Sequence, residues 1–277
     1  MIRLIATDLD DTLLNAQSGL SPRTKQALKR AIEIGCGICL SSGRMLEAMR
    51  PLAGEIGVNA PMLLYNGAMI YDINTDKTIY APRISHETAL GIVKLAEAHG
   101  WYVQCYPGKN YYCPKVLERT LKYAKQIGVE PTPVNKPLSE WLETDCQSDM
   151  QKLLIIGDDA ADADRALETM REAFPGGANF LKSRANFVEI APEGVNKGQS
   201  LVRLAEYLGL QITEVMAFGD GQNDTPMIAA AGTGVAMANA CPQAKAAADR
   251  IAPSNLEDGV AQIIEEYIEK GWLGGLA

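Results

Sequence analysis

Two aspartates lie two residues apart near the start of the chain, in the segment Asp8-Leu9-Asp10-Asp11-Thr12. The segment ends an apolar run of strand length, so both carboxylates leave the same predicted strand and can point at one ligand. Two neighbouring carboxylates repel each other unless a cation lies between them or one of them is protonated. The pair is therefore a candidate for a metal-binding nucleophile, Asp8, beside an acid/base group, Asp10. By itself the pattern also fits an ordinary acidic turn.

A second acidic loop, Gly219-Asp220-Gly221-Gln222-Asn223-Asp224, again lies between an apolar strand and a predicted helix. We expect Asp220 to contact a metal ion directly and Asp224 to orient the site or to bind the metal through water. Considered alone, this loop is equally a turn followed by an aspartate N-cap. Lys197 begins another predicted helix, and it would balance phosphate charge only if it lay beside these aspartates.

A third candidate is Ser42-Gly43-Arg44, which we expect at the start of a helix. A hydroxyl group, free backbone N–H groups and the positive end of a helix together bind anions. A plain Ser/Gly N-cap is the commoner explanation of such a pattern when it occurs alone.

The elements that must position these loops alternate between strand and helix in the first third and the last third of the chain. This alternation predicts an α/β core with a doubly wound, Rossmann-like parallel sheet, in which loops after successive strands meet at one edge. From Pro82 the rhythm changes to strands accompanied by two or three helices. We therefore predict a discontinuous core, residues 1–82 and 191–277, with an inserted α+β cap domain, residues 83–190, between its two parts.

Composition narrows the classes of function. The chain has 277 residues, of which 47% are hydrophobic and 22% charged, as in globular proteins, and its formal charge is −8. An acidic surface disfavours nucleic acids and anionic membranes as partners. No apolar stretch approaches the ~20 residues needed to span a bilayer, and the N-terminus lacks the features of a signal peptide. We expect a cytoplasmic protein, and no feature indicates a protein partner.

One cysteine pair, Cys36 and Cys39, has the spacing of a redox or zinc motif. The surrounding segment is predicted to be a strand, in which residues three apart point to opposite faces. No second such pair or nearby histidine completes a zinc site. We interpret both thiols as structural.

Together, these loops resemble the haloacid dehalogenase superfamily of phosphohydrolases, in which a D-x-D-x-T segment, a Ser/Thr, a lysine and a G-D-x-x-N-D segment follow in this order. The resemblance is closer to the Cof-type sugar-phosphatase branch, and it rests on five segments: Asp8-Leu9-Asp10-Asp11-Thr12-Leu13-Leu14, Ser42-Gly43-Arg44, Tyr65-Asn66-Gly67-Ala68, Asn196-Lys197-Gly198 and Gly219-Asp220-Gly221-Gln222-Asn223-Asp224. In that branch a large α/β (C2-type) cap lies between the second and third motifs. The predicted insert, residues 83–190, is thus expected to control access of the substrate.

The resemblance implies a role for each motif residue. Mg²⁺ would be held by Asp8, the backbone carbonyl of Asp10 and Asp220, with Asp224 supporting the metal site; oxygen ligands suit this ion. Asp8 would form an aspartyl-phosphate, and Asp10 would serve as the acid and then the base. The phosphoryl oxygens would be held by Leu9, Ser42, Gly43, Lys197 and Asn223. The substrates implied are small organic phosphate monoesters, sugar phosphates in particular.

Two other functions use the same residues. A phosphomutase, an isomerase, hands the phosphoryl group back to a sugar rather than to water, and the motifs do not separate it from a phosphatase. A non-catalytic phosphate-binding regulator would be expected to lack at least one chemical group, yet Asp8, Asp10, Lys197 and Asp220 are all present. A dehalogenase explains Asp10 and Asp220 less well. The identity of the substrate depends on the insert, whose sequence carries no decodable motif; its tyrosines are more often packing residues than ligands.

Overall fold

The computed structural model describes residues 1–108 and 110–276. The chain forms two compact units. The first comprises Met1–Gly43, Arg50–Tyr80 and Asn196–Ala277, and the second comprises Arg44–Met49 and Ala81–Val195. No helix in the described ranges combines the length and the apolar character that crossing a membrane requires.

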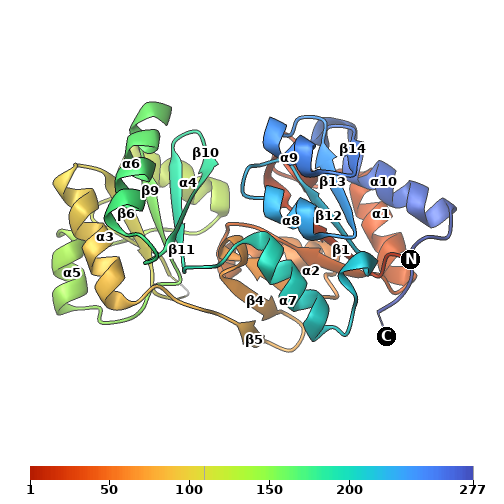
Figure 1. Cartoon of the computed structure of the whole chain (residues 1–277), viewed down its shortest axis with the longest axis horizontal. Coiled ribbons are helices and arrows are strands. Elements are labelled where there is room, and N and C mark those ends of the chain that lie inside the picture. Colours follow the sequence, from red (N-terminus) through yellow and green to blue (C-terminus); the bar gives the residue numbers. More distant parts are fainter. Residues whose placement is uncertain (109, 277) are drawn as a thin grey trace. The chain divides into compact units, whose positions relative to one another are not determined.

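A five-stranded sheet, in the order β14-β13-β12-β1-β2, forms the centre of the first unit (Figure 1). All neighbouring strands are parallel. The strands are β1 (Leu4–Thr7), β2 (Gly37–Leu40), β12 (Val215–Gly219), β13 (Thr233–Met237) and β14 (Arg250–Ala252). The helices of this unit are α1 (Pro22–Glu33), α7 (Lys197–Tyr207), α8 (Thr225–Ala230), α9 (Pro242–Ala247) and α10 (Gly259–Glu269). Helix α2 (Leu46–Ile56) is divided between the two units. The predicted α/β class with a parallel, doubly wound sheet is confirmed.

The central strands are short apolar runs in which every residue is buried, as expected for strands that are covered on both faces. On one face, Leu201 of α7 and Met227 of α8 share a core with Leu4 and Ala6 of β1. Figure 1 shows α1 and α10 on the other side of the sheet. The register of the strands is therefore set by burial on both faces.

The strand order reverses next to β1. The chain passes from β1 to β2 on one side, whereas β12 pairs with the other side of β1 and leads outward to β13 and β14. Open parallel sheets bind ligands at such a switch point, beyond the carboxyl ends of the strands. Asp8 follows β1 and Asp220 follows β12, so both aspartates leave the sheet at this point.

Residues 62–80 form a further, smaller sheet. The strands β3 (Met62–Leu64), β4 (Met69–Asp72) and β5 (Lys77–Tyr80) form a three-stranded antiparallel sheet, in which β4 and β5 are a hairpin. The helical turn Tyr65–Gly67 reverses the chain directly after β3, and β4 therefore pairs antiparallel with β3. An isolated parallel bridge joins Ser41 and Leu63.

The second unit contains a six-stranded sheet, in the order β10-β11-β9-β6-β7-β8, together with helices. Its strands are β6 (Tyr102–Tyr106), β7 (Tyr112–Cys113), β8 (Thr132–Pro133), β9 (Lys152–Ile156), β10 (Asn179–Arg184) and β11 (Phe187–Ala191). Its helices are α3 (His86–Ala98), α4 (Glu118–Ile127), α5 (Leu138–Thr144) and α6 (Ala160–Ala173). One face of the sheet is covered by apolar residues of α3, α5 and α6, which form a core of their own. The insert therefore combines strands and helices as predicted for its class.

The aromatic and cysteine residues discussed above serve the packing. Tyr106 and Tyr111 are almost completely buried and stack on each other at a centroid distance of 5.3 Å. Cys36 and Cys39 are buried free thiols, and burial raises the pKa of each to about 12. The burial of both thiols supports the structural interpretation of this cysteine pair.

Candidate active site

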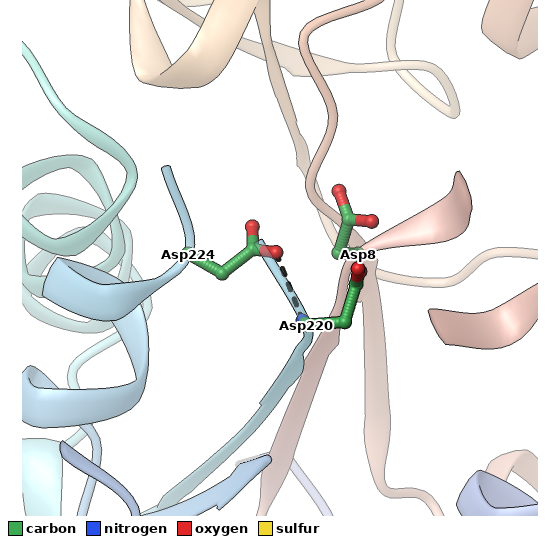
Figure 2. A group of neighbouring side chains, drawn as sticks. All are labelled: Asp8, Asp220 and Asp224. Atoms are coloured by element: carbon green, nitrogen blue, oxygen red, sulfur yellow. Dashed lines mark hydrogen bonds between the residues drawn. The ribbon is translucent and has the colours of Figure 1, made fainter. Parts of the chain in front are cut away.

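Three carboxylates from distant parts of the sequence meet at the switch point of the first sheet. One oxygen each of Asp8, Asp220 and Asp224 lies within 4.8 Å of the other two. Figure 2 shows Asp8 at the end of β1, Asp220 at the end of β12 and Asp224 just before α8, with the side chains directed toward one another. A hydrogen bond from the backbone N–H of Asp8 to the carbonyl of Phe218, at 3.0 Å, ties the two strand ends together.

The ammonium group of Lys197 lies between two of these carboxylates. Its Nζ atom is 2.5 Å from Oδ1 of Asp8 and 2.5 Å from Oδ1 of Asp224. It also donates to the backbone carbonyl of Ser41 at 3.2 Å. The side chain of Lys197 is fully buried, with 0% of its surface exposed, so this lysine is a component of the cluster and not a solvated surface group.

The pKa values of these groups follow from burial and from their mutual charges. Burial, and then the charge of Asp224, raises the pKa of Asp8 well above its ordinary value, although Lys197 opposes this. The pKa of Asp220 rises to about 7, first through burial and then through Asp224. Burial lowers the pKa of Lys197, but Asp224 and Asp8 raise it by more. Three carboxylates thus face one ammonium, and a divalent cation would relieve the remaining repulsion.

The acidic loop after β12 is held by its own last residue. Oδ2 of Asp224 accepts hydrogen bonds from the backbone N–H groups of Asp220, at 3.1 Å, and Gly221, at 2.9 Å. Thr12 donates from Oγ1 to Oδ1 of Asp220 at 2.8 Å. The carboxylate of Asp224 therefore folds back onto the loop and contacts Lys197. It makes no capping hydrogen bond to α8, so Asp224 is not a plain N-cap.

Close packing of two helices places the lysine. Asn196 caps α7 by accepting a hydrogen bond from the backbone N–H of Gln199 at 2.9 Å, and Lys197 is the first residue of the helix. A Cβ atom at Gly198 would lie 2.2 Å from the backbone carbonyl oxygen of Pro226 in α8. Only glycine permits this approach, which brings the start of α7 beside the loop that carries Asp224.

The loop at Ser42 does not lie at the start of a helix, where the sequence predicted it. The backbone N–H of Ser42 donates to the carbonyl of Leu63 at 2.9 Å, and the Ser42 carbonyl accepts from the N–H of Asn66 at 3.0 Å. These bonds keep Ser42 in the extended continuation of β2, so α2 begins only at Leu46. The expectation of a helix start at Ser42-Gly43-Arg44 is therefore wrong, although the buried hydroxyl of Ser42 does lie just beyond the sheet edge.

The remaining predicted residues lie nearby. Asp10 is half-buried in the helical turn Leu9–Leu13 that follows Asp8, and its carboxylate is outside the group of three described above. The side chain of Leu9 is fully buried in the same turn, so it offers a ligand only its backbone. Asn223 donates from Nδ2 to Oδ1 of Asn66 at 3.1 Å. The sequence indicates Asn66 only through the segment Tyr65-Asn66-Gly67-Ala68 that carries the family resemblance, and this segment gives no reason to expect the contact with Asn223.

The donor set suits a magnesium ion. Asp8, Asp220 and Asp224 offer carboxylate oxygens alone, and no thiol or imidazole group takes part in this cluster of described residues. Hard oxygen ligands are those that Mg²⁺ and related divalent ions prefer. The chemistry of the cluster therefore fits the metal that the sequence predicted.

Comparison with known proteins shows to which family the chain belongs. The family model of the haloacid dehalogenase-like hydrolases matches residues 5–264. The chain belongs to this family. Its motifs place it among the Cof-type members, as predicted. Metal ions, generally Mg²⁺, are used throughout this superfamily, in agreement with the acidic cluster.

Relatives of this hydrolase extend over nearly its whole length. A pyridoxal phosphate phosphatase of Escherichia coli is 30% identical over 96% of this chain and 98% of its own. A 5-amino-6-(5-phospho-D-ribitylamino)uracil phosphatase of Bacillus subtilis is 29% identical over 96% of each. A solved haloacid dehalogenase-like hydrolase of Bacteroides thetaiotaomicron has a TM-score of 0.86 and 32% identity, over 96% of this chain and 99% of its own. The chain is a phosphoric monoester hydrolase of the haloacid dehalogenase type.

Proposed function

We propose that this hydrolase cleaves small organic phosphate monoesters, sugar phosphates in particular, in a magnesium-dependent reaction through an aspartyl-phosphate on Asp8. The observation that carries the proposal is the position of Lys197, whose Nζ atom contacts Asp8 and Asp224 at 2.5 Å each. A lysine in this place, beside three clustered carboxylates, supports a site built for a cation and an anionic phosphoryl group together.

In the first half of the proposed reaction, a carboxylate oxygen of Asp8 attacks the phosphorus atom as the bond from phosphorus to the leaving oxygen breaks. Asp10 gives its proton to the leaving alkoxide, and the alcohol departs. The half-buried position of Asp10, two residues beyond Asp8, supports its separate role as the acid.

In the second half, Asp10 takes a proton from a water molecule. The oxygen of this water attacks the phosphorus atom, the bond from Asp8 to phosphorus breaks, and inorganic phosphate and the free carboxylate of Asp8 result. Bound Mg²⁺, held by Asp8, the backbone carbonyl of Asp10 and Asp220, would neutralise charge on the phosphoryl oxygens. Asp224 would maintain this arrangement by holding both the acidic loop and Lys197.

The phosphoryl oxygens would be held by donors on several loops: the backbone of Leu9, the Ser42 hydroxyl, the Gly43 N–H, Lys197 and Asn223. Catalysis of phosphoryl transfer depends mainly on such positioning and charge stabilisation. The names of two relatives support small metabolites as substrates, because one names pyridoxal phosphate and the other a compound with a phosphorylated ribityl group. The predicted insert, residues 83–190, is proposed as the cap that selects among them.

The decisive experiment replaces Asp8 by asparagine and measures hydrolysis of p-nitrophenyl phosphate with magnesium. Asparagine keeps the shape of the side chain but is a far weaker nucleophile, so we expect a loss of at least roughly a thousandfold in kcat. Asp11→Asn is the matched control, because Asp11 is exposed, three residues away, and tolerates asparagine at its positive φ of 60°. It should retain wild-type turnover.

Wild-type turnover in Asp8→Asn would sink the proposed mechanism. Labelled water offers an independent check: under single-turnover conditions the label should enter inorganic phosphate and not the carboxylate of Asp8, because water attacks phosphorus. Release of free phosphate from sugar phosphates, in place of interconversion of their isomers, would distinguish the phosphatase from a phosphomutase.

A further inference from the structure

A strained turn connects the loops of the proposed site. Tyr65 and Asn66 have positive φ angles of 53° and 56°, in the left-handed region that residues other than glycine seldom occupy. Two successive non-glycine residues in this region cost free energy, and they persist only where the surrounding structure holds them. The turn Tyr65–Gly67 joins β3 to β4 within the first unit.

The contacts that hold this turn lead to three separate motif segments. The backbone N–H of Asn66 donates to the carbonyl of Ser42 at 3.0 Å. Oδ1 of Asn66 accepts a hydrogen bond from Nδ2 of Asn223 at 3.1 Å. The next residue, Gly67, accepts at its carbonyl from the hydroxyl of Ser200, in the helix that begins with Lys197, at 2.7 Å. Asn66 therefore lies where the Ser42 loop and the acidic loop meet.

One half of the Asn66 amide has no protein partner. The residue is 2% exposed, and Nδ2 has no hydrogen-bond acceptor within the part of the chain that the structure describes. A buried amide donor that is left unpaired is costly, and most such groups in proteins are satisfied by protein, water or a ligand. The oxygen of the same amide is paired with Asn223, so a reversed amide would bring two NH₂ groups together.

The unpaired nitrogen faces the Gly43 loop. A Cβ atom built on Gly43 would lie 2.9 Å from Nδ2 of Asn66, closer than to its Oδ1 at 3.3 Å. The side-chain amide thus occupies the space that a side chain at position 43 would need. Its NH₂ group lies against the residue whose backbone N–H is proposed to hold a phosphoryl oxygen.

We propose that Asn66 is a further phosphoryl-binding residue. Its Nδ2 donates a hydrogen bond to an oxygen of the dianionic phosphoryl group, beside the N–H of Gly43. Its Oδ1 accepts a hydrogen bond from one N–H of the Asn223 amide, so the second N–H of that amide is left to donate to the same phosphoryl group. The inference rests on the proposed phosphatase function and adds a donor to its site. If Asn66 served only to form the turn, a positive φ would be sufficient. That role explains neither the hydrogen bond from Asn223 nor the buried, unpaired Nδ2 donor.

The test compares two variants, Asn66→Gly and Asn66→Asp. Glycine keeps the positive φ without strain and removes the whole amide. Aspartate keeps the shape and the acceptor for Asn223, but it replaces the donor by an oxygen that repels phosphate. With p-nitrophenyl phosphate, kcat/KM should fall roughly 10- to 100-fold in Asn66→Gly and further in Asn66→Asp. The inhibition constant of inorganic phosphate should rise by about tenfold or more in both variants, a readout that a purely structural role would not move.

The matched control is Asn135→Gly, because Asn135 has nearly the same φ, 57°, but lies in the second unit. It should leave kcat/KM and phosphate inhibition at wild-type values. Thermal unfolding checks that Asn66→Asp is folded. Phosphate inhibition at the wild-type level in folded Asn66→Asp would overturn the inference and would leave the Asp8 mechanism standing. Retained turnover in Asp8→Asn would instead overturn the mechanism.

Discussion

Lys197 places a buried ammonium group among the clustered carboxylates. A buried ammonium is stable only when carboxylates surround it, and a cluster of buried carboxylates needs a cation in turn. The contacts of Nζ with Asp8 and Asp224, at 2.5 Å each, meet both needs. The same lysine thus offsets the buried negative charge of the cluster, and in the proposed reaction it would also balance the charge of a phosphoryl group.

Replacing Lys197 by methionine tests this double role. Methionine fills similar volume but leaves Asp8 and Asp224 facing each other without a cation, and breaking a buried pair in this way costs about 3–5 kcal/mol. We expect a loss of this size in the free energy of unfolding, measured by urea denaturation with a chelator present. Phosphatase activity should fall below detection.

Lys25→Met is the comparison, because Lys25 pairs with Glu55 at the surface and its side chain is 47% exposed. Surface pairs contribute little, so this variant should change stability by less than about 1 kcal/mol and should keep its activity. Equal stability of the two variants would mean that the buried lysine is not needed to hold the acidic cluster together.

At the scale of secondary structure, the approach of α7 to α8 positions the site. Gly198 of α7 lets the backbone carbonyl of Pro226 in α8 occupy the space that a side chain at position 198 would fill. Lys197 directly precedes Gly198, and Asp224 lies two residues before Pro226. Any separation of the helices would therefore move both ends of the ion pair.

Gly198→Ala should show this coupling. A Cβ atom 2.2 Å from the Pro226 oxygen forces the helices apart, which we expect to cost about 1–3 kcal/mol in unfolding free energy. Because small displacements of catalytic groups are costly, kcat should also fall by roughly tenfold or more. Stability from denaturant titration and kcat from steady-state assays, measured on one preparation, would check both.

The same substitution at Gly54 provides the control. Gly54 lies in α2, and no atom comes within 4 Å of the point where a Cβ atom would lie, so alanine meets open space there. Alanine is the better helix former, and Gly54→Ala should stabilise the protein by up to about 1 kcal/mol with unchanged kcat. A stabilised, fully active Gly198→Ala would contradict the packing argument.

At the scale of the whole molecule, the two units differ in how the chain builds them. The first is assembled from segments at both ends of the sequence, whereas Ala81–Val195 of the second is continuous. This continuous segment contains a six-stranded sheet and its own core, which includes Val103, Leu153 and Ile190. A continuous segment with its own core has what independent folding requires.

We therefore expect the isolated segment 81–195 to fold by itself. Its far-ultraviolet circular dichroism should show mixed helix and strand, and its urea unfolding should be cooperative. The remaining segments, joined by a short linker, should bind magnesium without it, because Asp8, Asp220 and Asp224 all lie in the first unit. A non-cooperative transition in the isolated segment would show that the units depend on each other for stability.

The sequence by itself determined the class of fold and the order of the chemical groups. Apolar runs that end in Asp8 and Asp220 predict buried parallel strands, because strands covered on both faces need such runs, and parallel strands bring their following loops to one edge. The motif residues and their spacing indicated the family, because both are properties of short segments of the sequence. The domain limits near residues 82 and 191, and the role of each site residue in the reaction, stay predictions.

Only the tertiary structure decided which side chains meet. Lys197 and Asp8 are 189 positions apart, and Asn223 and Asn66 are 157 apart. No local pattern encodes such pairs, because they depend on how helices and turns pack across the sheet. The delayed start of α2 escaped prediction for the same reason: long-range backbone hydrogen bonds to Ser42 outweighed local preference.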